Sequence, residues 1–362
     1  MTANQYQISS ADIIQRVPRS NKNPYACAVV KDVPINTPAI VAFGGEYTQS
    51  LRAANSYANL LQRLAEENNI SQGVNFYSVV YKFGTRSPNL ERVEQFRIAG
   101  RKLREKIHPL LQQEHDAIIR EMNKHEPVAN YVIQLYNILL KPRIVITNNT
   151  TPDPEQTINN MHKIMFYAHC HGAATIWQMA EYMRVQMIQK GFTSRDVMRI
   201  QKELLVIQHS PIAPLDKQRF TTLSFASAED TMMQYHQNLF IQWMGENSAD
   251  ISPAYFKNGN LFVAGHLKEM SFQEHDHSGL LHTDENSWPL TPDGRIIFSA
   301  ERNALARGMR NMIAGTGRLP SIQKLVDGDG VDFSEMRKSG DFLYNVMLND
   351  LRQQNPKHDH QK

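Results

Sequence analysis

Short apolar runs alternate with amphipathic segments along the first part of the chain. Residues 37–43 (TPAIVAF) have the pattern of a buried strand, which ends at Gly44 and Gly45. From Ser50 to residue 65, apolar and small residues recur every three or four positions, which predicts a helix with Ser50 as its N-cap. Residues 73–83 (GVNFYSVVYKF) are β-branched and aromatic and predict a second strand. The order strand, helix, strand indicates a parallel pair.

The same alternation returns in the middle of the chain. Residues 163–168 (KIMFYA) predict an apolar strand, and a turn of small residues separates it from a helix that runs through residue 183. Further strands are predicted at 203–207, 220–225 and 261–264, and helices at 89–124, 128–140 and 332–351. The alternation predicts an open, mostly parallel sheet with helices on both faces.

These elements divide the chain into three parts. We expect an N-terminal extension at 1–30, an α/β core at 31–331, and a C-terminal helix with a polar tail at 332–362. The helical stretch in the first half of the core is about twice what one crossover needs, so a helical insertion is expected at about 87–155.

Composition narrows the class of protein. Lys and Arg number 39 against 36 Asp and Glu among 362 residues, a balance that does not indicate a nucleic-acid partner. The two cysteines, Cys27 and Cys170, cannot build a disulfide framework or a four-cysteine zinc module, which favours a reducing compartment such as the cytoplasm. We expect neither a signal peptide nor a membrane span, because no apolar run is long enough.

The turn after the central strand carries the main chemical candidate. Ala168-His169-Cys170-His171-Gly172 places small residues two positions on either side of a cysteine, between a strand and a helix. Small flanks are required where a nucleophile occupies a strained turn, because bulky ones collide with the neighbouring strand or with the helix. The positive end of a helix dipole also stabilises a thiolate. This pattern predicts a nucleophile elbow with sulfur in place of oxygen.

On these residues the sequence resembles the α/β-hydrolase superfamily, in particular its cysteine-nucleophile type represented by dienelactone hydrolase, with a downstream order similar to that of lipases. The resemblance implies a three-layer sandwich and a triad ordered nucleophile, acid, histidine. Cys170 is then the nucleophile, Asp230 the acid with Glu229 in reserve, and His277 the general base with His275 second.

The resemblance also implies an oxyanion hole. One backbone N–H would come from His171, the residue after the nucleophile, and others from Gly45 and Glu46 in the loop after the first parallel strand. The implied activity is that of an esterase, thioesterase or acyltransferase that works through an acyl-enzyme on a small-molecule or acyl-carrying substrate. No cofactor is expected.

Three other interpretations stay open. In one of them Cys170 is an inert buried thiol, since cysteine is among the most buried residue types. The chain could then be a noncatalytic interaction protein that keeps the fold and binds a protein partner through the helices at 87–140. Alternatively, two His-x-His pairs, His169 with His171 and His275 with His277, could supply four ligands to a metal-dependent hydrolase.

Overall fold

The computed structural model describes residues 7–16, 27–45, 48, 50–70, 73–85, 128–148, 150–209, 211, 213, 218–227, 261–264 and 299–314. The strands are β1 (Gln7–Arg16), β2 (Cys27–Val30), β3 (Ala39–Phe43), β4 (Asn75–Thr85), β5 (Ile146–Thr147), β6 (Thr151–Pro152), β7 (Ile164–His169), β8 (Leu205–His209), β9 (Thr221–Ser227) and β10 (Leu261–Ala264). The α-helices are α1 (Leu51–Glu67), α4 (Asn130–Leu139), α5 (Pro154–Met161), α6 (His171–Gln189), α7 (Ser194–Lys202) and α10 (Ser299–Ala314), and η2 (Lys141–Arg143) is a 3₁₀ turn. The helices predicted at 89–124 and 332–351 lie outside the described residues.

One large sheet organises the described residues. Its strand order is β10-β9-β8-β7-β3-β4-β1-β2, and β5 pairs with β6 in a separate two-stranded sheet. The six strands from β10 to β4 run parallel, whereas β1 is antiparallel to both β4 and β2. This mostly parallel sheet with helices confirms the predicted α/β-hydrolase-like fold.

The central strands are apolar throughout because both of their faces are covered. All six residues of β7 are buried. Phe166 and Ala168 contribute to one core cluster, and Met165 and Tyr167 to the other. Side chains alternate between the two faces of a strand, so a strand between two helical layers reads as an uninterrupted apolar run.

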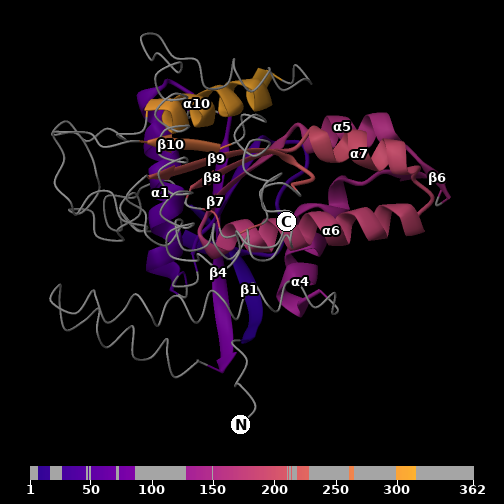
Figure 1. The fold of residues 1–362 in the computed structure, drawn as a ribbon, viewed down its shortest axis with the longest axis horizontal. Coiled ribbons are helices and arrows are strands. Elements are labelled where there is room, and N and C mark those ends of the chain that lie inside the picture. The colour runs from indigo at the N-terminus through magenta and orange to yellow at the C-terminus, as the bar shows by residue number, and fades with distance from the viewer. Residues whose placement is uncertain are drawn as a thin grey trace, which may run out of the picture.

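Helices cover the two faces of the sheet in two groups (Figure 1). Helices α1 and α10 pack on one face, and α4, α5, α6 and α7 lie on the other. None of the described helices combines the length and apolar character that a membrane span requires.

The first helix follows the sequence pattern closely. Ser50 is the N-cap of α1, and its side chain accepts a hydrogen bond from the backbone N–H of Ala53 at 3.1 Å. Ala54, Ala58 and Leu61 are fully buried on the face that packs against the sheet. A cap and an apolar stripe together specify where this helix starts and which face it buries.

Strands β1 and β2 lie within residues 1–30, the region expected as an N-terminal extension. Residues 7–16 and 27–30 are paired strands of the main sheet, and no strand was predicted there from the sequence. The sequence of β1 (QISSADIIQR) mixes polar and apolar residues, and its pairing with β4 shifts register near Ile8. A bulged strand has no regular alternation, which explains why the pattern did not predict it.

The described part of the predicted insertion contains α4, which packs against α6 and β1 on a face of the sheet. Arg143, directly after α4, is completely buried. Its Nη1 donates to the carbonyl of Leu139 at 2.5 Å and its Nη2 to the carbonyl of Pro34 at 3.0 Å. Burial lowers the pKa of Arg143 to about 10, so the guanidinium remains charged at neutral pH. This side chain attaches the end of α4 to the segment before β3.

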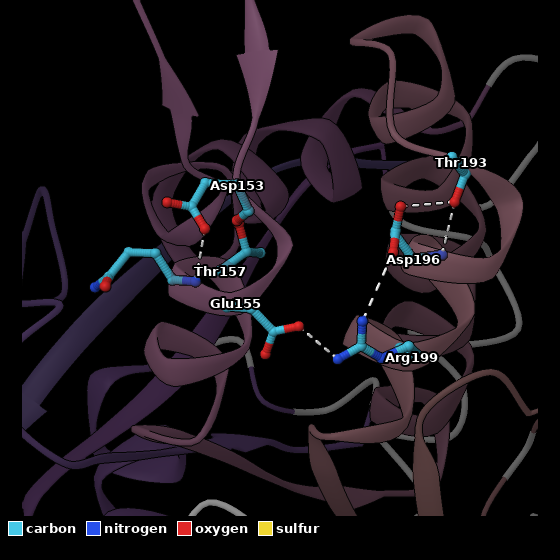
Figure 2. Close-up of polar contacts among 7 residues, drawn as sticks. Asp153, Glu155, Thr157, Thr193, Asp196 and Arg199 are labelled. Atoms are coloured by element: carbon cyan, nitrogen blue, oxygen red, sulfur yellow. Dashed lines mark hydrogen bonds and ion pairs between the residues drawn. The ribbon is translucent and has the colours of Figure 1, made fainter.

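Helices α5 and α7 lie side by side and are joined at their surface (Figure 2). Asp153 caps α5 by accepting from the N–H of Gln156, and Thr193 caps α7 by accepting from the N–H of Asp196. Arg199 of α7 forms an ion pair with Glu155 of α5 at 2.7 Å. The caps fix both helix starts, while the exposed ion pair adds little stability.

Candidate active site

Cys170 lies at the sharp turn between β7 and α6, in the centre of the sheet. Its backbone has φ 52° and ψ −121°, a left-handed φ that is rare for a residue with a side chain. Its N–H donates to the carbonyl of His209, at the end of the neighbouring β8, at 3.2 Å. The strand, turn and helix predicted around this cysteine are therefore present, and the turn is strained at the cysteine itself.

Gly172 explains how this turn fits against the sheet. A Cβ atom at position 172 would lie 2.1 Å from the carbonyl oxygen of Phe43 and 2.7 Å from its carbonyl carbon. Phe43 is the last residue of β3 and pairs with Ala168 of β7. Only glycine fits at position 172, which is the steric reason that the sequence pattern suggested.

The glycine turn after β3 lies beside Cys170. A Cβ atom at Gly45 would lie 3.4 Å from the Cβ of Cys170 and 3.3 Å from Nδ1 of His169. Cys170 itself is 4% exposed, so only a small part of its surface is open to a reactant. The glycine turn therefore lies next to the side chain of Cys170.

Tyr57 of α1 connects the glycine turn to His169. Its hydroxyl accepts a hydrogen bond from the N–H of Gly45 at 3.3 Å and lies 3.0 Å from Nδ1 of His169. The His169 ring stacks on that of His209, with centroids 6.0 Å apart. The Gly45 N–H, implied as an oxyanion donor, is thus bonded to a tyrosine in this structure.

His171 occupies the opposite side of the turn, at the first position of α6. Its ring lies edge-on to Tyr81 at 5.5 Å between centroids, and its Nε2 lies 3.5 Å from the hydroxyl of Tyr131. Burial lowers the pKa of His171 to about 4, so its imidazole is neutral at physiological pH. The helical ladder supplies no acceptor for N–H groups in the first turn of a helix, which keeps the backbone of His171 compatible with an oxyanion donor.

Tyr81 lies between the two sides of the turn. Burial raises the pKa of Tyr81 well above its usual range, although its hydrogen bond to Thr175 acts in the other direction. Smaller increases come from the nearby Tyr131, Tyr57 and Cys170. Because its hydroxyl stays protonated, Tyr81 adds no negative charge next to the thiol.

The other predicted site residues lie outside the described part of the chain. Asp230 and Glu229 follow β9, His275 and His277 follow β10, and Glu46 follows Gly45. Since β9 and β10 run parallel to β7, their ends and Cys170 lie at the same edge of the sheet. The triad therefore remains a prediction.

The predicted metal pair is split by the turn. His169 contacts Tyr57 and His209, whereas His171 contacts Tyr81 and Tyr131 on the other face. The hypothesis assumed a continuous strand, in which alternate residues point the same way, but α6 begins at His171. Within the described ranges, no group of three or more His, Cys, Asp or Glu residues could hold a metal ion.

Sequence reasoning missed Tyr57 and His209. Tyr57 follows the same helical spacing as the core residues of α1, and nothing in the sequence separates it from them. His209 carried a weak signal, because Gln208 and His209 end an otherwise apolar strand at the edge where Cys170 was expected. Polar residues at that end of a parallel strand are typical of a site.

Comparisons with known proteins add little. No family model matches the chain, and no curated protein matches it. Two solved structures of esterase B from Lactobacillus rhamnosis are similar to it, one with a C4-C4 SN3 tributyrin phosphonate and the other C6-C4 SN3 inhibited. The first aligns with 10% identity and a TM-score of 0.27 over 98% of this chain and 91% of that one. The second has 10% identity and a TM-score of 0.26, over 98% and 93%. At such scores the likeness carries no weight, and the fold assignment rests on strand order and direction.

Proposed function

We propose that this protein is a hydrolase or acyltransferase that acts on an ester or thioester, with Cys170 as its nucleophile. The observation that carries the proposal is the left-handed backbone of Cys170 between β7 and α6, which Gly172 permits by its close approach to Phe43. A packing cysteine does not need a strained turn at a helix N-terminus, whereas a nucleophile held clear of the sheet does.

In the proposed reaction, the Cys170 thiolate attacks the acyl carbon and a C–S bond forms as the carbonyl oxygen becomes an oxyanion. The oxyanion collapses, the bond to the leaving alcohol or thiol breaks, and the leaving group takes a proton from the imidazolium of the general base. Water or another acceptor, deprotonated by the same base, then attacks the thioester and releases the thiol. His277, oriented by Asp230, is the proposed base, with His275 and Glu229 as the reserve pair.

The surroundings of the thiol support this assignment in two respects. The N-terminus of α6, a helix of 19 residues, lies at Cys170 and favours a thiolate. A second backbone segment passes beside the cysteine, because a Cβ atom at Gly45 would lie 3.4 Å from the Cβ of Cys170. The two cysteines do not form a disulfide with each other, and we propose that the protein works in a reducing compartment such as the cytoplasm.

Alkylation of single-cysteine variants tests the proposal. Cys27 is a matched control because burial raises the pKa of its thiol. Iodoacetamide is expected to label Cys27→Ser, which retains Cys170, much faster than Cys170→Ser, which retains Cys27. A thiol pKa lower by one unit gives about tenfold more thiolate at neutral pH.

A second measurement assigns the base. His277→Ala is expected to slow the labelling of Cys170 toward the rate of Cys27, and incubation with p-nitrophenyl acetate is expected to leave an acetyl group on Cys170 in the wild type only. Equal and slow labelling of both thiols, with no acetyl adduct, would contradict the enzymatic assignment and favour the noncatalytic interaction protein.

A further inference from the structure

The buried hydroxyl of Tyr57 lies where three parts of the candidate site meet. Tyr57 is 5% exposed and projects from α1 toward the end of β3. Its oxygen lies 3.3 Å from the nitrogen of Gly45 and 3.0 Å from Nδ1 of His169, the residue before the nucleophile. One phenol therefore joins the glycine turn to the end of the nucleophile strand.

The packing around this phenol leaves little freedom. A Cβ atom at Gly44 would lie 2.7 and 2.9 Å from two ring carbons of Tyr57, so the turn rests directly on the ring. A Cβ atom at Gly45 would lie 3.3 Å from Nδ1 of His169 and 3.4 Å from the Cβ of Cys170. A shift of the Tyr57 ring would be transmitted to the backbone facing the thiol.

The direction of one of the two hydrogen bonds is fixed. The Gly45 N–H can only donate, so the phenol oxygen accepts from it. Between the phenol and Nδ1 of His169 either atom can be the donor, because the role of the ring nitrogen depends on its tautomer. In both cases the hydroxyl links the glycine turn to His169.

We propose that Tyr57 is a positioning residue for the acyl-transfer site. The proposal rests on the proposed function, because it assigns Tyr57 a role toward the Cys170 nucleophile. By holding Gly45 to His169, the hydroxyl fixes the position of the glycine turn beside Cys170, and so the space in which the acyl group meets the sulfur. Acyl transfer depends on such fixed positions, since a misplacement of about 1 Å can lower the rate by about 100-fold.

Tyr57→Phe tests the role, because it removes the hydroxyl and keeps the ring that supports Gly44. Tyr136→Phe is the matched control, since the buried hydroxyl of Tyr136 on α4 has no hydrogen-bond partner among the residues that the structure describes. The probe is p-nitrophenyl acetate, and the readouts are the burst rate of p-nitrophenol release, its dependence on probe concentration, and the rate of Cys170 alkylation by iodoacetamide. Alkylation displaces iodide without forming an oxyanion, so it reports on the thiol alone.

Tyr57→Phe is expected to lower the maximal burst rate by about 10- to 100-fold while half-saturation and alkylation stay near the wild-type values. Tyr136→Phe is expected to retain all three. His169→Asn, which keeps a polar atom near the position of Nδ1, is expected to retain more burst rate than His169→Leu.

The other outcomes separate the two proposals. A wild-type burst rate in Tyr57→Phe would overturn the positioning role and leave the nucleophile in place. Equal losses of burst rate, alkylation and thermal stability in Tyr57→Phe would make the tyrosine structural only. Absence of both burst and fast alkylation in the wild type would overturn the proposed function and this inference with it.

Discussion

The substitution Gly172→Ala tests the steric account of the cysteine turn. The added methyl group would lie 2.1 Å from the carbonyl oxygen of Phe43 and 2.8 Å from its Cβ. A carbon atom and a carbonyl oxygen normally approach to about 3.3 Å, so the start of α6 or the end of β3 has to move by about 1 Å. β3 is a central strand of the sheet and α6 packs against it, so close packing resists that movement.

Overpacking a core by one methyl group costs about 1–3 kcal/mol, and the upper part of this range, about 2–3 kcal/mol, applies where the clash is with backbone atoms. The better helix propensity of alanine offsets at most about 1 kcal/mol. We therefore expect Gly172→Ala to lower the free energy of unfolding by about 1–3 kcal/mol, and the melting temperature by about 2–4 °C per kcal/mol. Because the displacement occurs at the turn, alkylation of Cys170 is also expected to slow.

Urea unfolding followed by circular dichroism measures the first effect, and iodoacetamide labelling measures the second. Gly45→Ala is the matched control for the unfolding measurement alone, because its methyl group would meet side-chain atoms of His169 and Cys170 at 3.3 and 3.4 Å, a far milder contact than that at Gly172. Surface substitutions usually change the free energy of unfolding by less than about 0.5 kcal/mol. A change this small in Gly172→Ala would refute the steric argument.

Three further predictions concern stability. The Gln208 side chain is fully buried, and its amide oxygen and nitrogen have no hydrogen-bond partner in the part of the chain that the structure describes. Gln208→Met is therefore expected to raise the free energy of unfolding, measured by urea titration, by about 1–3 kcal/mol. No gain would mean that the amide is hydrogen-bonded. The pKa of His171 is about 4 in the folded chain against 6.5 ordinarily, so the contribution of its neutral ring to the free energy of unfolding is complete above pH 6.5 and about 3 kcal/mol is lost as the pH falls through 4. The dependence of the unfolding free energy on pH in this range is expected to weaken in His171→Asn. An unchanged dependence would disprove the assignment. Ser50→Ala removes the N-cap of α1 and is expected to cost about 1 kcal/mol, whereas Ser50→Asp is expected to retain the wild-type melting temperature; equal melting by Ser50→Ala would show that the cap adds nothing.

The central strands could be predicted because they are buried on both faces. β7 and β8 read as short apolar runs, and the intervening helices have regular spacing, so strand order along the chain and parallel direction followed. β1 could not be predicted in the same way. It is antiparallel and bulged, and it contains Ser9, Ser10 and Asp12 among its apolar residues.

The candidate site also contains one part that the sequence predicts and one part that it does not. The turn at Cys170 follows a local sequence pattern of small residues around the cysteine, although the steric demand on Gly172 comes from Phe43 of the neighbouring strand β3. The contacts of Tyr57 depend on the packing of α1 against β7, and its partner His169 lies 112 positions later in the sequence. A single sequence contains no signal for such a pairing when the tyrosine also fits an ordinary apolar stripe.

Arg143 has a consequence for how the fold responds to acid. The acceptors of its Nη1 and Nη2 groups, the carbonyls of Leu139 and Pro34, are peptide groups that do not titrate. The ion pair between Arg199 and Glu155, by contrast, disappears once the carboxylate takes up a proton. As the pH falls, the ion pair on the surface of α5 and α7 is lost, whereas the hydrogen bonds that attach the end of α4 to the segment before β3 persist, because no titrating acceptor takes part in them.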